Sequence, residues 1–233
     1  MFLKKIGLSV LLILPSLILS GCSWIKGRSF YADLTCQLPC WQNIVSGVTT
    51  EEEALRILRN SASIDQQSLS TTGSAWLIFD DIIRFRSAPK NWHGEAYILD
   101  QKVAKINFWG NLNLKFGDAI KVNGEPKFVI NIPTYRGPPG SPALGYSLIV
   151  IDPDRGIAYE FNTADLPELQ RGELRPDTPI RLMTYFDPDK YDEFLEAKLF
   201  SMGFLGREGT LEYLVPWTGF GSIKSKYPPA PVQ

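Results

Sequence analysis

Between Thr49 and Asn60, hydrophobic residues recur every three to four positions in an otherwise charged segment. This spacing predicts an amphipathic helix with an apolar stripe formed by Ala54, Leu55 and Leu58. Two threonines open the segment, each three residues before a glutamate, and this pattern predicts a capping box. Three consecutive glutamates at 51–53 suit the positive end of the helix dipole, so we interpret them as a helix start and not as a carboxylate cluster.

Two β-rich stretches follow this helix. In residues 74–87 the apolar positions alternate with others at period two, which predicts a strand with one apolar side made of Leu77, Phe79, Ile83 and Phe85. Residues 94–110 contain two apolar runs. The sequence Leu99-Asp100-Gln101-Lys102-Val103 between them has a polar centre, which predicts a hairpin turn. The first part of the domain is therefore expected to be a helix followed by antiparallel strands.

The same order recurs in the next part of the chain. A short helix is predicted from about Asp118 to Asn123, where Gly124 ends it and Pro126 prevents its continuation. Residues 145–162 then form a hairpin pattern, because two apolar strands flank the turn-forming sequence Asp-Pro-Asp-Arg-Gly. The repetition favours two related units.

One more strand and one more helix are predicted near the end of the chain. Residues 179–186 are mostly apolar, and Asp187-Pro188 is a typical helix start, with helical spacing of apolar residues up to Met202. The proline-rich end is expected to be an extended, unpacked tail. The predicted fold class is α+β, in one domain over residues 36–226, with units 36–110 and 111–165, a C-terminal extension 166–226 and a tail 227–233.

The first 21 residues have the pattern of an export signal. Two lysines precede an apolar run of about 14 residues, from Ile6 to Leu19, and a membrane-spanning helix needs roughly 18. The run ends in Leu-Ser-Gly-Cys, which resembles the lipobox of bacterial lipoproteins. The resemblance implies cleavage before Cys22, acylation of Cys22 by chains such as palmitate, and a tether over residues 22–35.

This resemblance also implies a location. A lipoprotein of this kind is extracytoplasmic and lipid-anchored to a bacterial membrane: the outer membrane if the organism has two, and otherwise the outer face of the cell membrane. Loss of the signal would leave 22 of the 24 basic residues against 25 acidic ones, a net charge of −3. That balance offers no basic surface for nucleic acid, so we expect no nucleic-acid partner.

Cys36 and Cys40 would then be the remaining thiols in an oxidising compartment. Together with the single histidine, His93, they supply too few ligands for a four-coordinate zinc site. A thioredoxin-type couple has two residues between its cysteines, whereas this pair has three. We expect a structural disulfide, with a metal site or free or redox-active thiols as alternatives, and we expect no cofactor.

No catalytic constellation is evident in the sequence. His93 lies among turn-forming residues without a nucleophile elbow to pair with, so we interpret it as a loop or strand-edge residue. Asp80 and Asp81 are adjacent in a predicted strand and would point to opposite faces. Asp152 and Asp154 suit local hydrogen bonding in the hairpin turn. We therefore expect no enzymatic activity.

Aromatic residues beside proline, glycine or polar neighbours are the candidates for a binding surface. These are Trp41, Trp92 and Trp217, together with Tyr135 at the start of the long loop Tyr135–Gly145. Exposed aromatic rings can stack on sugars or anchor a partner protein. The other interpretation is packing in the core for each tryptophan and a plain spacer for the loop Tyr135–Gly145.

Two short patterns resemble other bacterial lipoproteins. Glycines and caps around the two predicted helices, Gly47-Val48-Thr49 and then Gly117-Asp118 with Gly124-Glu125-Pro126, resemble the helix-then-sheet module of BamE-type and β-lactamase-inhibitor-like proteins. Pro39-Cys40-Trp41, followed by Ile44, Gly47 and Thr49, resembles the opening of a group of uncharacterised bacterial lipoproteins. The first resemblance implies a module without catalytic residues. The second group has no assigned activity to carry over, so this resemblance supports the architecture and leaves the function open.

The combined expectation is a membrane-anchored extracytoplasmic lipoprotein that binds an envelope protein or acts in envelope assembly. One alternative is an envelope glycan or small-ligand binding protein that uses the exposed tryptophans and the loop Tyr135–Gly145. Another is an extracytoplasmic hydrolase that uses acidic residues such as Asp80 or Asp81.

Overall fold

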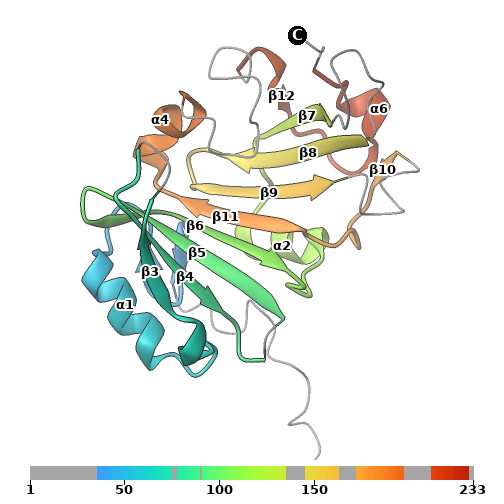
Figure 1. Cartoon of the computed structure of the whole chain (residues 1–233). Coiled ribbons are helices and arrows are strands. Elements are labelled where there is room, and N and C mark those ends of the chain that lie inside the picture. Colours follow the sequence, from blue (N-terminus) through green and yellow to red (C-terminus); the bar gives the residue numbers. More distant parts are fainter. Residues whose placement is uncertain are drawn as a thin grey trace, which may run out of the picture.

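An antiparallel sheet is the frame of the molecule (Figure 1). This computed structural model describes residues 36–74, 78–89, 91–134, 145–162, 172–196 and 211–230. Within these residues the sheet has nine strands: β3 Ser70–Gly73, β4 Asp81–Arg86, β5 Trp92–Leu99, β6 Lys102–Gly110, β7 Phe128–Thr134, β8 Gly145–Asp152, β9 Ile157–Asn162, β11 Leu182–Phe186 and β12 Val215–Pro216. Their order is β12-β7-β8-β9-β11-β6-β5-β4-β3. The predicted α+β class is confirmed.

β11 joins two meanders into this one sheet. It lies between β6 and β9 and is antiparallel to both, so that Met183 is opposite Phe108 on one side and opposite Tyr159 on the other. The strands β4, β5 and β6 come from the first predicted unit, and β7, β8 and β9 come from the second. The helix-then-strands order occurs twice, as expected, but the two units share one sheet.

The helices begin and end where local signals place them. In α1 (Glu51–Asn60) the side chain of Thr50 accepts a hydrogen bond from the Glu53 amide, at 3.3 Å, as the predicted cap requires. α2 (Phe116–Asn123) starts two residues before the predicted position and ends at Gly124, whose φ of +81° favours glycine. The shorter elements are β1 Cys40–Trp41, β2 Ile44–Val45, η2 Gln66–Ser68, β10 Glu173–Leu174, η3 Pro188–Lys190, α4 Tyr191–Glu196, β13 Gly221–Ser222 and α6 Ile223–Lys226.

The predicted last helix is present in its first part. Asp187 accepts a hydrogen bond from the Asp189 amide and so caps η3, which leads directly into α4. Its continuation to Met202 lies outside the described residues.

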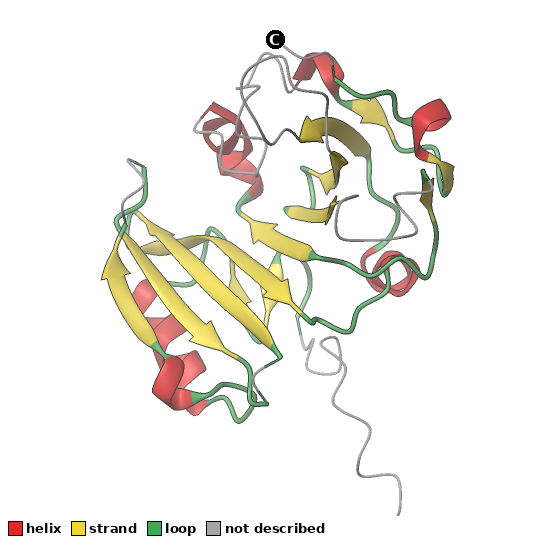
Figure 2. Ribbon diagram, turned by 45° about the vertical axis from the view of Figure 1, so that its right-hand side comes forward, coloured by secondary structure: helices red, strands yellow, loops and turns green. Residues whose placement is uncertain are grey.

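The sheet has two faces with different coverings. The first face packs against α1, α2 and the β1–β2 hairpin, and a buried row crosses it from β4 to β7: Phe85, Gly94, Phe108, Met183, Tyr159, Val150 and Val129. The second face carries a smaller apolar cluster, in which Phe186 and Ile149 contribute from the sheet and Phe194 contributes from α4. Figure 2 shows the strong twist of the sheet and α1 against one side of β3 to β6.

One predicted apolar side is wrong. Ile83 and Phe85 lie on the first face as expected, but Phe79 belongs to the cluster on the second face. β4 begins only at Asp81, and the chain bends at Asp80, so the residues before that bend do not follow the alternation of the strand. Leu77 lies outside the described residues.

The predicted unpacked tail is also wrong. Tyr227 and Ala230 are buried, and the chain runs along β7, where the Ala230 amide donates to the Asn131 carbonyl at 2.8 Å. The Asn131 side chain in turn donates to the Tyr227 carbonyl. Prolines exclude a helix here, but an extended chain suits packing beside a strand. The domain therefore extends at least to residue 230, beyond the expected boundary at 226.

Gly94 provides a test of the packing on the first face. A Cβ at this position would lie 2.2 Å from a ring carbon of Phe85. We expect Gly94→Ala to lower the free energy of unfolding by about 1–3 kcal/mol, because the strand has no room for the added methyl group. Urea denaturation measures this difference.

Gly73→Ala is the matched control. Gly73 is also a strand glycine, but it has open space around the position of a Cβ. We expect this variant to keep the parent stability or to gain a little. Equal losses in the two variants would contradict the packing account.

Candidate functional site

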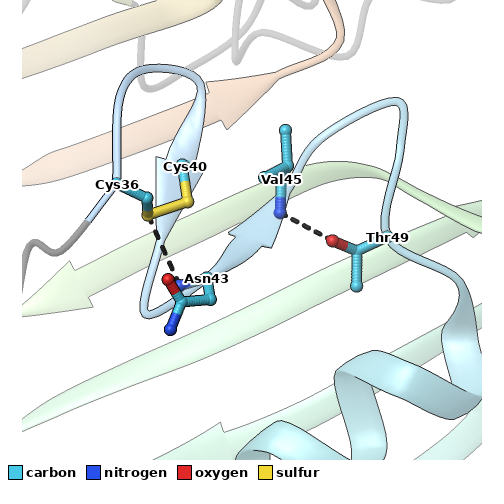
Figure 3. The surroundings of a disulfide bond; sticks show 5 residues. All are labelled: Cys36, Cys40, Asn43, Val45 and Thr49. Carbon is cyan, nitrogen blue, oxygen red and sulfur yellow. Dashed lines mark hydrogen bonds between the residues drawn. A yellow bond between two sulfur atoms is a disulfide. The ribbon is translucent and has the colours of Figure 1, made fainter.

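The Cys36–Cys40 disulfide closes the start of the domain, and the predicted disulfide is therefore confirmed (Figure 3). It ties the residues before β1 to β1 itself. The Asn43 amide donates to Cys36 Sγ at 3.4 Å, and the Val45 amide donates to Thr49 Oγ1 at 2.8 Å. These bonds fix the β1–β2 hairpin and its connection to α1.

The hairpin places Trp41 in the core. Only 1% of Trp41 is exposed, and its ring stacks on Phe85 with 5.6 Å between centroids and contacts Phe108 at 4.8 Å. The suggestion that Trp41 belongs to a binding surface is therefore wrong, since the strand pair turns its side chain inward. Core packing, the alternative for this residue, is what the structure has.

The other predicted surface aromatics offer little free ring area. Trp92 is half-buried and meets Trp41 edge to face at 5.7 Å, and Trp217 is half-buried and stacks on Tyr227 at 5.8 Å. Both pack against the core of the first face. Tyr135 and the rest of its loop up to residue 144 lie outside the described residues.

A continuous set of polar side chains crosses the second face. Arg84 donates to Thr72 Oγ1 at 2.6 Å and to Glu95 Oε1 at 2.8 Å. The other oxygen of Glu95 accepts from the Tyr97 hydroxyl at 2.6 Å. We call this set the polar network; it spans β3, β4, β5, β6 and β11 and consists of Thr72, Arg84, Glu95, Tyr97, Asn107 and Thr184.

The network continues to the centre of the sheet. The Asn107 side chain lowers the pKa of the Tyr97 hydroxyl, against the larger effects of burial and Glu95. The Thr184 hydroxyl donates to Asn107 Oδ1 at 3.0 Å. The side chain of Arg84 is 46% exposed, that of Glu95 is 18% exposed, and Thr184 is buried. The network therefore leads from solvent near β4 to a buried centre at β11.

Lys105 lies beside this buried centre. Its ammonium nitrogen lies 4.3 Å from the ring centroid of Tyr97 and 5.6 Å from that of Phe79, and only 3% of the residue is exposed. Burial lowers the pKa of Lys105 to about 7, although the nearby carboxylate of Glu95 acts in the opposite direction. Burial also raises the pKa of Tyr97, and its hydrogen bond to Glu95 adds to that shift.

A β-bulge brings Lys105 to the second face. Tyr97 is opposite Lys105 and Ile98 is opposite Val103, so Ala104 is an extra residue in β6. Strict alternation from Val103, which packs on the first face, would put Lys105 on the first face too. No local sequence pattern indicates this site, because the bulge leaves no signal in the alternation of residues.

His93 lies in β5, between β4 and β6, and not in a loop or at a sheet edge. It is opposite Arg86 and Trp109, and its ring stacks on Trp109 with 5.6 Å between centroids. The turn-forming residues before it form the end of the β4–β5 connection, so the prediction placed the start of the strand too late.

The two acidic pairs noted in the sequence, Asp80–Asp81 and Asp152–Asp154, lie at the start of β4 and in the turn after β8. Asp152 is buried and pairs with Arg155 at 2.6 Å, and Asp154 pairs with Lys127. Asp80 precedes β4 and Asp81 opens it; partial burial raises the pKa of nearby Glu51, and the charges of Asp81 and Asp80 raise it further. Within the described ranges, no three His, Cys, Asp or Glu side chains are arranged to hold a metal ion.

A hollow of about 470 Å³ lies along the exposed side of α1. It is lined by Thr50, Glu52, Glu53, Arg56, Arg59 and Asn60. The acidic side chains lie in the first turn of the helix and the basic ones follow toward its end, and none of the six side chains is buried. The hollow is therefore a charged helix surface, and the polar network with Lys105 is the stronger candidate site.

Comparison with protein-family models, with curated proteins and with solved structures gives no match to the chain. In the part of the chain that the structure describes, no helix is long and apolar enough to cross a membrane.

Lys105 predicts a pH dependence of stability. In the folded protein its pKa of about 7 lies below the ordinary value of 10.5, so unfolding takes up a proton between these two pH values. The free energy of unfolding should therefore rise with pH from about 7 to 9.5, by at most about 1.4 kcal/mol per pH unit. Urea denaturation at a series of pH values measures this slope.

Lys105→Met should remove the slope and raise the stability at pH 7, because methionine fills similar space without a charge to desolvate. Lys102→Met, on the exposed part of the same strand, is the control and should keep the slope. A Lys105→Met protein with the parent slope would show that another group causes it.

Proposed function

We propose that the chain is an extracytoplasmic, lipid-anchored protein that binds a protein of the cell envelope. The observation that carries this proposal is the Cys36–Cys40 disulfide, which follows the lipobox-like cysteine Cys22 by 14 residues. Disulfides persist in oxidising compartments and are rare in the cytosol. An export signal and a disulfide in one chain support the same location.

The disulfide also suits a tethered domain. Acylation at Cys22 would leave residues 23–35 between the lipid and the disulfide, and a chain of this length reaches at most about 45 Å. The hydrogen bond from the Ser46 amide to the Pro39 carbonyl, at 3.0 Å, holds the disulfide loop against the domain. A pull on the tether would therefore act on a cross-linked hairpin that is packed in the core.

Binding accounts for the described surface better than hydrolysis does. Asp152 and Asp154 are each paired with a cation, and Asp80 and Asp81 are adjacent residues on either side of a strand start. Hydrolysis by two carboxylates needs them on opposite sides of one bond in a shared cleft. Glycan stacking has less support than protein binding, because Trp41, Trp92 and Trp217 pack against one another or against core residues.

The anchor has a direct test. Cys22→Ser removes the acylated thiol, and two or three acyl chains are needed for stable attachment to a membrane. We expect the parent protein in the membrane fraction and Cys22→Ser in the soluble extracytoplasmic fraction or retained with an uncleaved signal. Cell fractionation with immunoblotting measures this, and metabolic labelling with a fatty acid provides the second readout.

Ser23→Ala is the matched control, since it changes the next residue and keeps the thiol. It should fractionate and label like the parent. A parent protein that takes up no fatty acid, or a Cys22→Ser variant that labels equally, would contradict the lipid anchor.

The partner is tested by cross-linking in cells. Photoreactive residues at Val48 and Val122 suit this purpose, because these side chains are 66% and 56% exposed and their replacement disturbs no core packing. We expect at least one position to give a defined cross-linked product with the anchored protein. The same positions in Cys22→Ser should give less product, because that protein is not held at the membrane.

The control is the same probe at Ile44, which is buried and should cross-link to no other chain. If no position gives a product above the Cys22→Ser background, the proposal of an envelope partner loses its support.

A further inference from the structure

The strand β3 forms one edge of the sheet, and its four residues are exposed (Figure 1). It pairs with β4 on one side, and in the described part of the chain no strand lies on its other side. Its sequence, Ser-Thr-Thr-Gly, has neither the charges nor the proline that commonly protect a sheet edge from another chain. Open space also surrounds the Cβ position of Gly73.

The opposite edge of the sheet is protected. β12 contains Pro216, which has no N–H group to donate to a further strand. The end of the chain also runs beside β7, where the Ala230 amide donates to the Asn131 carbonyl. Among the described residues, the sheet therefore has one covered edge and one open edge.

Hydrogen bonds before β3 show which backbone groups of β4 face this edge. The Arg86 amide donates to Ser68 Oγ at 2.9 Å, and the Arg86 carbonyl accepts from the Asp65 amide at 2.9 Å. Both backbone groups of Arg86 therefore point to the β3 side. The direction alternates along an antiparallel strand, so the backbone groups of Arg84 and Ile82 point to the same side.

The same alternation decides which groups of β3 remain open. Arg84 and Ile82 are opposite Ser70 and Thr72, which consequently direct their N–H and C=O groups toward β4. Thr71 and Gly73 lie at the alternate positions and direct their N–H and C=O groups away from β4. In the described structure these four groups form a template without a strand on it.

An antiparallel second copy of β3 satisfies this template in one register. When Thr72 is opposite Thr72 of the second copy, Thr71 of each copy is opposite Gly73 of the other. Each of these two pairs can exchange two hydrogen bonds, so all the outward groups of Thr71 and Gly73 are used. The register is unchanged when the two copies are exchanged, as a two-fold symmetric dimer requires.

The charges of α1 also suit a second copy in this orientation. α1 begins beside β6, where Thr50 forms a bridge with Lys102, and the chain after its end reaches the end of β4, where Ile64 forms a bridge with Ser87. α1 therefore runs opposite to β3. Its first turn holds three glutamates, and its last turn holds Arg59.

A two-fold axis between the two β3 strands is perpendicular to the joined sheet. It places both α1 helices on the same face and in opposite directions. The acidic start of each helix is then level with the basic end of the other, so the two helices are complementary in charge. The four residues of β3 carry no charge and bring no repulsion of their own to the strand pair.

We propose that β3 pairs with β3 of a second copy of this chain, so that two sheets join edge to edge. This dimer goes beyond the proposed partner binding and rests neither on the lipid anchor nor on an envelope protein. Four backbone hydrogen bonds between two short strands make a small contact, whereas specific stable interfaces bury about 1,600 Å². The dimer should therefore depend on protein concentration.

Cysteine cross-linking tests the register. In a Cys22→Ser background Cys36 and Cys40 are joined, so an added cysteine is the one free thiol of the chain. Thr72→Cys then places the two new cysteines opposite each other in a non-hydrogen-bonded pair, with Cα atoms about 4.5 Å apart, which a disulfide can bridge. We expect the purified full chain in mild detergent to form a covalent dimer on oxidation, seen by non-reducing electrophoresis.

Ser70→Cys in the same background is the matched control. Ser70 lies on the same strand and the same face as Thr72 and is also exposed. Its two copies would lie about 14 Å apart in the proposed register, beyond the reach of a disulfide, so we expect at least about tenfold less covalent dimer. Equal yields in the two variants, whether high or low, overturn the proposal.

A second variant acts on the outward hydrogen bonds. Thr71→Pro removes an N–H that points away from β4, whereas Thr71→Val keeps it. Added to Thr72→Cys, the proline should lower the dimer yield by about tenfold, because each copy loses one bond, and the valine should not. Thermal unfolding should show that both variants are as stable as the parent; an undiminished yield with the proline would count against the strand pairing.

The same cysteine variants in cells identify any other occupant of the edge. A cross-linked product that contains a different chain, without a dimer in the purified protein, would overturn the proposal and assign the edge to that chain. The purified dimer needs neither membrane nor envelope protein. Failure of the lipid anchor or of the envelope partner therefore leaves this result unchanged, and loss of the dimer leaves the anchor unchanged.

Discussion

The pairing of β11 with both β6 and β9 is the interaction on which the rest of the structure depends. The meander β3–β4–β5–β6 and the meander β7–β8–β9 would otherwise each end in an open edge, one at β6 and one at β9. Residues 182–186 satisfy both edges at once, and Met183 and Tyr185 supply the buried side chains at the middle of the first face. These contacts join residues far apart in the sequence, so the sheet can close only after most of the chain is available.

The same junction gives the second face its polar centre. Thr184 lies between the two buried side chains of β11 in sequence and points to the opposite face, where it donates to Asn107. The bulge in β6 then turns Lys105 toward Tyr97 on that face. The alternation of side chains in β11 and the bulge in β6 place three polar groups on the second face: the Thr184 hydroxyl, the Asn107 amide and the Lys105 amine. No short stretch of the sequence contains all three residues.

Local signals predicted the elements, and long-range contacts decided what the sequence left open. The cap at Thr50, the turn at Asp100 and Gln101, with φ of +51° and +62°, and the hairpin around Gly156 all depend on neighbouring residues, and all three were predicted. The position of β11 in the sheet, the face of Phe79 and the packing of Tyr227 depend on partners that are distant in the sequence, such as Phe194 for Phe79 and Asn131 for Tyr227. Of the candidate site, the disulfide was predicted and the polar network was not, since its members come from five strands.

Packing alone does not explain the amine at position 105. The space between the rings of Phe79 and Tyr97 would accept a methionine, which is flexible, apolar and favourable beside aromatic rings, without the cost of desolvating a charge. A cation over aromatic rings regains part of that cost, but only while the amine stays charged, and burial acts against the charged form. Lys105 lies at a β-bulge, and its charge lowers stability where an apolar side chain would fit. Local inconsistencies of this kind are typical of functional positions.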